Sequence, residues 1–398
     1  MDKLPAEMSD GRRSLPAFSI SGILVSFLGA ILPAWGYHLT ADLGEVGEYF
    51  LTLNIGFLLS VALGQWLLPR RGLRFTLILA NTLAGIGFVF LALYSPPAAA
   101  SWRIWGVLWL GASAGLLNAC LFLAISSLYE RDRATTVNLA GVLFGLGCFA
   151  TPLLVAGTYY AYTVPGILML LAILPAAYAV FCAKAKLSSE CGAAPVPVSQ
   201  VLRELNSPSA LLFSLLLFFQ FGNEWSIGGW LSLFLIRRLG ISPPQSLLML
   251  ALYWLVLLLG RMLSQLMLAS VSQTLMLIGS FVSSLLGVVV LAFTNNRFGA
   301  LMGILFVAAG FACVYPLVAE KMAHRFPKYH AGLYNGIFSL AVTGGFLAPW
   351  LLGYVAQAFG IGAVMVAPIL GTCIVFVLVL LIMLEAKLSG FSQAKPVE

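Results

Sequence analysis

The sequence predicts an all-α membrane protein whose twelve transmembrane helices form two six-helix bundles. Of its 398 residues, 61% are hydrophobic and only 9% are charged, whereas a water-soluble domain carries about 25% charged residues. The apolar residues gather in stretches of about 20, the length an α-helix needs to cross a hydrocarbon core of about 30 Å. These stretches do not alternate polar with apolar residues, so the pattern also excludes a membrane β-barrel.

Charged residues, prolines and glycines divide the chain into two sets of six predicted spans. The first set lies at residues 17–39, 48–68, 73–95, 102–129, 134–158 and 163–183, and the second at 208–236, 244–269, 272–294, 297–320, 330–357 and 361–385. The first stretch is too long for the core of a cleaved signal peptide and is interpreted as a retained span. The polar segment between the sets predicts an N-terminal bundle over 1–183, a cytoplasmic linker over 184–207, and a C-terminal bundle with a tail over 208–398.

The basic residues predict the orientation of these spans. Most of the 21 lysines and arginines lie in the loops on the side of both termini; four lie in loops on the other side, namely Arg103, Arg237, Arg238 and Arg297. The positive-inside rule then places both termini in the cytoplasm of a multi-pass protein of the cell (inner) membrane. The net charge of +7 is explained by these short loops and does not indicate nucleic-acid binding.

The six cysteines lie almost all in apolar runs and show no CxxC spacing, which predicts free buried thiols. We therefore expect no disulfide framework, no metal site and no cofactor. The expected partners are a small-molecule solute, a coupling proton or sodium ion, and membrane lipid, and we expect the protein to be monomeric.

The two sets of spans repeat one another. In the fifth and eleventh spans an asparagine is followed by a glycine nine residues later and a proline fourteen residues later, as Asn138, Gly147 and Pro152, and as Asn335, Gly344 and Pro349. Gly115 precedes Glu130 at the end of span four by fifteen residues, as Gly310 precedes Arg325 at the end of span ten, and the apolar runs of spans two and eight end at Gly64 and Gly260. All these similarities relate one span to the span six later, which predicts two parallel repeats that enclose a site between them.

The whole chain resembles the major facilitator superfamily, whose fold has this organisation. The short loop over residues 64–74 contains Arg70, Arg71 and Arg74 and is similar to the signature loop of that superfamily. The resemblance implies a gating role for these arginines at the cytoplasmic face. The aspartate of the signature is absent, with Leu68 or Pro69 in its place.

Three further stretches resemble the fucose and glucose symporter branch. They are residues 138–147 with Pro152, residues 221–230, and residues 260–261. The second is the most specific, because that branch carries an acidic residue and a tryptophan in this part of span seven. The chain departs from the branch at Phe122 and Gly141. The resemblance implies cation-coupled symport of a sugar or a similar small polar solute.

Glu224 is the acidic residue that the sequence places deep inside a span. At 1.5 Å per residue it lies about 24 Å along the helix from Pro208, where an ionisable side chain is a functional hypothesis by default. Apolar surroundings favour the neutral form of a carboxyl group, so we predict that Glu224 couples transport to a proton or a sodium ion. The alternative is a structural carboxylate bonded to a neighbouring helix.

Arg261 is the basic residue that falls within a span. Helical rise places it nearer the cytoplasmic end and about 12 Å from Glu224 along the membrane normal. We therefore expect no direct pair between the two, and expect Arg261 to snorkel or to pair with an inner-face carboxylate such as Glu320. The predicted gating residues are thus Arg70, Arg71, Arg74, Arg261 and Glu320.

Amide and aromatic side chains within the spans are candidates for solute binding, because a cavity for polar molecules needs hydrogen-bonding groups and aromatic platforms. Amides also form hydrogen bonds between neighbouring helices, and tryptophans and tyrosines also anchor the ends of spans at the membrane interface. The candidates are Trp35, Asn54, Asn118, Asn138, Gln220, Asn223, Trp230, Trp254, Tyr315 and Asn335.

The sequence favours a secondary transporter over an enzyme, because it contains no nucleotide-binding or metalloprotease motif. The leading hypothesis is cation-coupled symport of a sugar or similar solute by alternating access. The alternatives are proton-driven export of drugs or other amphiphiles, and a non-transporting receptor that kept the fold.

Overall fold

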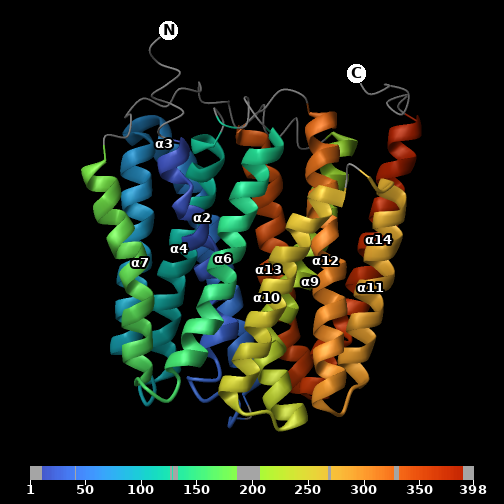
Figure 1. The fold of residues 1–398 in the computed structure, drawn as a ribbon. Coiled ribbons are helices and arrows are strands. Elements are labelled where there is room, and N and C mark those ends of the chain that lie inside the picture. Colours follow the sequence, from blue (N-terminus) through green and yellow to red (C-terminus); the bar gives the residue numbers. More distant parts are fainter. Residues whose placement is uncertain are drawn as a thin grey trace.

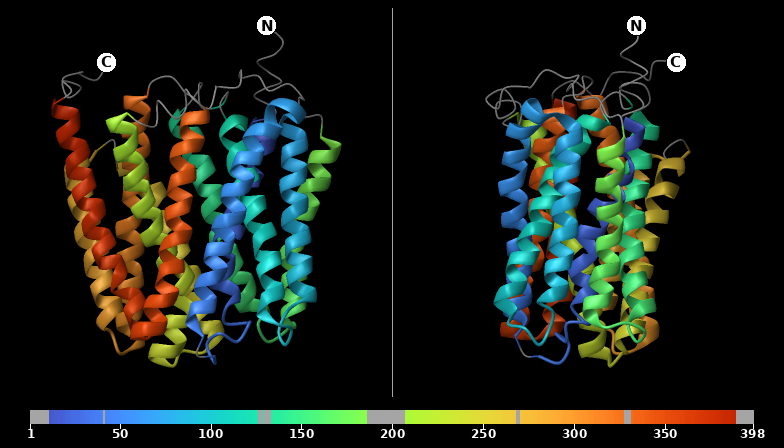
Figure 2. Two further views of the ribbon diagram at one scale, coloured as in Figure 1. Left: turned by 180° about the vertical axis from the view of Figure 1, so that it is seen from behind. Right: turned by 90° about the vertical axis from the view of Figure 1, so that its left-hand side faces the viewer.

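The computed structural model describes residues 11–40, 42–125, 128, 133–185, 207–267, 270–326 and 331–388. Figure 1 shows these residues as a bundle of long helices that run roughly side by side. Helix α2 begins, and helix α14 ends, on the same side of the bundle (Figure 2). We call this side the terminal face and the other side the opposite face.

The helices of the N-terminal half are α2 (Pro16–Ile31), α3 (Leu43–Leu93), α4 (Ala100–Ala124), α6 (Arg133–Thr158) and α7 (Val164–Lys184). Those of the C-terminal half are α9 (Pro208–Leu239), α10 (Pro243–Met267), α11 (Gln273–Phe293), α12 (Arg297–Arg325), α13 (Ala331–Phe359), the 3-10 helix η1 (Ile361–Met365) and α14 (Ala367–Leu388).

Eleven helices among the described residues are long and apolar enough to cross a membrane, and one of them makes two crossings. Helix α3 has 51 residues, or about 77 Å at 1.5 Å per residue, more than twice the thickness of a hydrocarbon core. It turns back at Gly72, whose φ of 76° and ψ of 173° are not helical and suit a residue without a Cβ. The twelve predicted spans are therefore confirmed.

The first span ends earlier than the sequence predicts. Its helix stops at Ile31, and residues 32–39 form a series of turns. Gly36 has a φ of 83°, which does not continue a right-handed helix. The predicted linker over 184–207 lies almost wholly outside the described residues.

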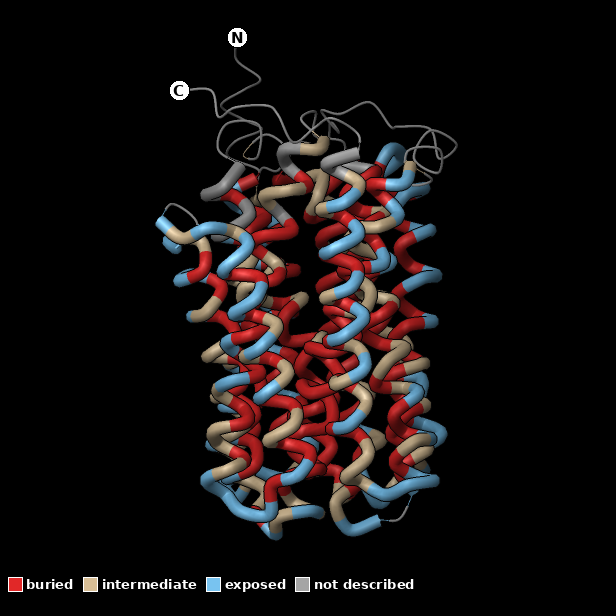
Figure 3. The backbone as a smooth tube through the Cα atoms, turned by 90° about the vertical axis from the view of Figure 1, so that its right-hand side faces the viewer, coloured by how far each residue is buried: buried red, intermediate tan, exposed pale blue. Residues whose placement is uncertain are grey.

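Polar residues begin several of these helices. Thr163, Ser207, Ser272 and Asn296 each accept a hydrogen bond from a backbone N–H in the first turn, at the starts of α7, α9, α11 and α12. These caps satisfy donors that would otherwise lack a partner. Figure 3 shows exposed residues around the outside and buried residues within. The exposed ones include large apolar side chains such as Leu59, Leu266 and Leu370, as expected for a surface in contact with lipid.

Packing repeats between the two halves as the sequence spacing predicts. A Cβ at Gly147 of α6 would overlap the Ser19 carbonyl of α2, and a Cβ at Gly344 of α13 would overlap the Phe218 carbonyl of α9. The two repeated glycines therefore make the same backbone contact in each half, between equivalent pairs of helices. Between the halves, α6 packs on α10 and α13 packs on α3, which are also equivalent pairs.

Candidate functional site

A cavity of about 140 Å³ lies between the two halves. Four helices of each half line it: α2, α3, α4 and α6, and α9, α10, α12 and α13. Its lining residues come mainly from the parts of these helices nearer the terminal face. Ten of the 23 described residues that line it are aromatic: Phe18, Phe57, Phe122, Phe144, Phe221, Trp225, Tyr315, Tyr334, Phe338 and Phe346.

The halves close against each other on the opposite face. A Cβ at Gly29 of α2 would overlap the Gly228 carbonyl of α9, and Ser232 Oγ donates to the Gly29 carbonyl at 2.6 Å. Helices α3 and α13 also meet there, where the Leu43 N–H donates to Gln357 Oε1 at 2.8 Å. The cavity thus lies on the terminal-face side of a tight contact between the halves.

Glu224 and Arg261 form a buried ion pair at the wall of this cavity. Arg261 Nη2 lies 2.6 Å from Glu224 Oε2, and the two residues are 8% and 1% exposed. Arg261 lines the cavity, and its guanidinium lies 5.2 Å from the centre of the Tyr315 ring. The prediction that these two residues do not pair is therefore wrong.

The direction of the side chains explains the error. Side chains on an α-helix lean toward its N-terminus. Helix α9 begins at the terminal face, so Glu224 leans toward that face. Helix α10 begins at the opposite face, so Arg261 leans the other way and the two side chains approach each other. Counting helical rise between Cα atoms, as the sequence prediction does, leaves out this convergence.

Other polar groups hold the Glu224 side of the pair. Gln220, one turn earlier on α9, donates from Nε2 to Glu224 Oε1 at 2.9 Å. Tyr253 of α10 donates its hydroxyl to the Glu224 backbone carbonyl at 3.0 Å. The carboxylate therefore has a charged partner on one oxygen and an amide donor on the other, the arrangement that a buried anion needs.

Two predicted amides lie between the halves. Asn118 of α4 lines the cavity and donates from Nδ2 to Asn335 Oδ1 of α13 at 2.7 Å and to Ser339 Oγ at 3.2 Å. Tyr315 of α12 also lines the cavity. The side chain of Asn138, the equivalent of Asn335, lies outside the described part of the chain.

The remaining predicted binding residues do not line the cavity. Trp230 stacks on Phe50 and donates from Nε1 to the Pro349 carbonyl at 3.0 Å, so it belongs to the closed contact. Trp254 packs on Gly228. Asn223 points toward Gly371 of α14, Asn54 is buried in α3, and Trp35 packs on Phe27 and Tyr49.

The predicted gating residues make mostly local contacts. Arg70 lies over the Trp66 ring and Arg71 over the Phe75 ring. Arg74 donates to the Cys182 and Ala183 carbonyls at the end of α7, where carbonyl groups lack helical partners. Glu320 accepts a hydrogen bond from Gln273 Nε2 at 3.1 Å. Arg261 pairs with Glu224 rather than with Glu320. Their gating role stays a prediction.

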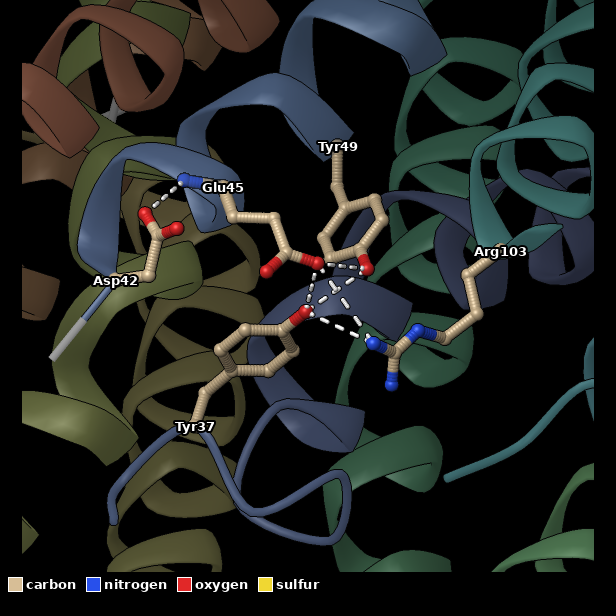
Figure 4. A network of polar contacts seen from close by, with 5 residues as sticks. All are labelled: Tyr37, Asp42, Glu45, Tyr49 and Arg103. Atoms are coloured by element: carbon tan, nitrogen blue, oxygen red, sulfur yellow. Dashed lines mark hydrogen bonds and ion pairs between the residues drawn. The ribbon is translucent and has the colours of Figure 1, made fainter. Parts of the chain in front are cut away.

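A second polar network lies near the opposite face and escaped the sequence analysis (Figure 4). Arg103 of α4 lies 3.7 Å from Glu45 Oε1 and donates to the Tyr37 hydroxyl at 3.2 Å. Tyr37 and Tyr49 each donate to Glu45 Oε1, at 2.5 and 2.9 Å. Burial and the bond to Glu45 raise the pKa of Tyr37 well above its ordinary value, so its hydroxyl remains a donor. The network ties the turn at residues 32–39 to α3 and α4.

The aromatic lining of the cavity is the other feature that the sequence analysis missed. In the sequence Phe122 marks only a departure from the fucose and glucose symporter pattern, yet it lines the cavity, and its ring centre lies 4.8 Å from that of Phe338 of the other half. Trp225 likewise lines the cavity and stacks on Phe221. An aromatic residue that faces such a cavity and one that faces lipid have the same sequence signal.

Comparison with known proteins agrees with this architecture. The model of the Major Facilitator Superfamily matches residues 14–348 and 213–396. None of the curated protein sequences compared with the chain is significantly similar to it.

Two solved structures with similar folds share few residues with this chain. An Escherichia coli fucose:proton symporter superposes with a TM-score of 0.66 at 13% identity, covering 95% of this chain and 99% of the symporter. A D-xylose-proton symporter superposes with a TM-score of 0.73 at 14% identity, covering 93% and 97%. On the extent of the family match and the agreement of the fold, the chain is a member of the major facilitator superfamily and a membrane transporter, not an enzyme.

Proposed function

We propose that this transporter couples the movement of a small organic solute to a proton, with Glu224 and Arg261 as the coupling pair. One observation carries the proposal: a buried carboxylate is bonded at 2.6 Å to an arginine that itself lines the central cavity. A proton on Glu224 would remove the negative charge that holds Arg261, and so change the wall of the cavity. Occupancy of the cavity and protonation of the carboxyl group are then linked.

A proton fits this site better than a sodium ion. Sodium would have to bind a carboxylate that already contacts a guanidinium, and the two positive charges would repel at close range. A proton neutralises the carboxylate without needing further oxygen ligands. Of the two coupling ions that the sequence leaves open, the site therefore supports the proton.

The packing of the two halves supports a mechanism of alternating access. The contact at the opposite face includes close glycine backbones and single hydrogen bonds, such as that of Ser232 to Gly29, beside the stacked rings of Phe50 and Trp230. Rocking of one half against the other would open this contact and close the terminal face. A bound solute would shift the balance between these states by its difference in affinity for them.

The cavity favours a solute with a large apolar face over a sugar. Each buried hydroxyl that finds no partner costs about 1–3 kcal/mol, and a hexose carries several. The polar side chains among the described lining residues are few. Asn118 Nδ2 is already bonded to Asn335, and Arg261 is bonded to Glu224 through Nη2. Sugar symport remains a prediction, and the lining supports the amphiphile alternative for the class of solute.

The setting of the transporter is part of the proposal. The basic loops favour a protein of the cell (inner) membrane with both termini, and the linker over 184–207, in the cytoplasm. We also propose that the bundle boundaries lie at residues 183 and 208 and that the protein is monomeric.

Accumulation by proteoliposomes tests the function. Liposomes with an alkaline interior are given radiolabelled hexoses, pentoses, aromatic carboxylates and lipophilic cations in turn. Wild-type protein is expected to accumulate one class, while Glu224→Gln is expected to exchange that solute without accumulating it. Asp42→Asn is the matched control, because it makes the same change at a helix cap, where asparagine also caps well. Accumulation by Glu224→Gln at the wild-type level would refute the coupling role, and binding without exchange would indicate a receptor.

A further inference from the structure

We infer that the solute is an amphipathic monoanion, an organic carboxylate with an aromatic or aliphatic body. The inference rests on the proposed function and extends it to a class of solute. It depends on three features of the cavity: its apolar wall, the single charge on that wall, and the balance of charge when Glu224 takes up a proton.

The wall of the cavity fits an apolar ring. Phe122 of α4 and Phe338 of α13 face each other across the two halves at 4.8 Å between ring centres, and Phe221 lies 6.3 Å from Phe338. The volume of about 140 Å³ is close to that of an engineered protein cavity of about 150 Å³ that binds benzene. Aromatic rings favour edge-to-face and offset contacts at these separations.

Arg261 is the single charged side chain among the described residues that line the cavity. Its Nη2 is bonded to Glu224, but in the described part of the chain its buried Nε has no hydrogen-bond partner. The residue is more than nine-tenths buried, so that unused donor is in an environment where an unsatisfied group is costly. A guanidinium presents its donors as a planar fork that matches a carboxylate.

Charge balance points to an anion. A guanidinium in a protein does not lose its proton, so protonation of Glu224 leaves a buried positive charge without a counter-ion. The carboxylate of a solute at Arg261 restores neutrality. One proton is then held on Glu224 and one anion is held by Arg261. With the solute bound, the charges of Arg261 and of the solute cancel and Glu224 is neutral, so the site carries no net charge. Transport of the anion together with the proton moves no net charge across the membrane.

Binding measurements on purified protein test the inference. The probes are benzoate, phenylacetate and 3-phenylpropionate, each with its uncharged amide. At least one carboxylate is expected to bind at least tenfold more tightly than its amide, and Arg261→Met is expected to remove this preference while still binding the amide. No preference for the carboxylate across the three pairs would overturn the inference.

The pH dependence separates the anion from the proton. Wild-type protein is expected to bind the carboxylate more tightly at pH 5.5 than at pH 8. Glu224→Gln mimics the neutral acid, so it is expected to bind tightly at both pH values. Among the described residues, the other titratable groups near the pair are Tyr253 on α10, Tyr315 on α12 and Cys148 on α6. Cys148→Ser is expected to keep the wild-type pH dependence.

The two proposals can fail separately. If the amides are accumulated with protons in a Glu224-dependent way and the carboxylates are not preferred, the anion inference is wrong and proton coupling stands. If the carboxylates bind through Arg261 with equal affinity at both pH values in wild-type protein, the anion site stands and proton coupling through Glu224 is wrong.

Discussion

Separate replacement of Glu224 and Arg261 should destabilise the protein in different ways. Glu224→Gln leaves Arg261, a residue that is 8% exposed, with a guanidinium that cannot lose its charge. Removing one partner of a buried ion pair costs about 3–5 kcal/mol, and we expect this variant to lose that amount at any pH between 5 and 8.

Arg261→Met should show a loss that depends on pH. The carboxyl group left behind can take up a proton and become neutral. A carboxyl group with the reference pKa of about 4.3 needs about 3.7 kcal/mol to stay protonated at pH 7, and about 1 kcal/mol at pH 5. The folded variant then binds one proton more than the unfolded chain, so its stability falls as the pH rises.

Tryptophan fluorescence during unfolding by dodecyl sulfate in mixed micelles measures both effects. The sequence contains nine tryptophans, which give the signal. The double variant Glu224→Gln with Arg261→Met should lose less stability than Glu224→Gln alone, because no unpaired charge remains. Equal losses for Arg261→Met at pH 5 and pH 7, or losses below about 1 kcal/mol for both single variants, would refute the burial of the pair.

Three further predictions concern the packing of the halves. Gly147→Ala should destabilise the protein by about 1–3 kcal/mol, because its Cβ overlaps a backbone carbonyl of α2; the control Gly157→Ala on the same helix meets nothing within 4 Å and should be neutral. Gly47→Trp should prevent closure of the opposite face, since even a Cβ there would lie 2.7 Å from the Trp350 carbonyl oxygen. Labelling of an engineered cavity cysteine from each side of the membrane would show this loss of closure, with Gly44→Trp as the control. Arg103→Met should cost about 1.5–3 kcal/mol through loss of the charge-assisted hydrogen bond to Tyr37 and of the ion pair with Glu45, and unchanged unfolding would contradict the network in Figure 4.

Sequence predicted the fold well because the length of an apolar stretch is itself the constraint that a bilayer imposes. The two halves were predictable from the spacing of Asn138 and Gly147 against Asn335 and Gly344. Gly147 brings α6 into backbone contact with α2, and Gly344 brings α13 into backbone contact with α9. These two helix pairs are equivalent, so the repeated spacing reflects repeated packing.

The site was harder to predict, for two physical reasons. The partner of Glu224 depends on the lean of two side chains on antiparallel helices, which a count along each helix does not include. Aromatic residues such as Phe122 and Phe338 cannot be assigned to a cavity by composition, because lipid tails are as apolar as a cavity wall. The sequence also could not distinguish Asn118 from Asn223, which points toward α14, or from Asn54, which is buried in α3.

The measurement that tests proton coupling most directly is the pH change during downhill movement of solute. Proteoliposomes with equal internal and external pH are given an inward gradient of the solute class that the wild-type protein accumulates. With wild-type protein, the external medium should become alkaline as solute enters, beyond the change seen in protein-free liposomes. With Glu224→Gln, exchange of solute should continue without this excess alkalinisation. Proton movement by Glu224→Gln at the wild-type rate, or solute entry through wild-type protein with no pH change, would contradict the account.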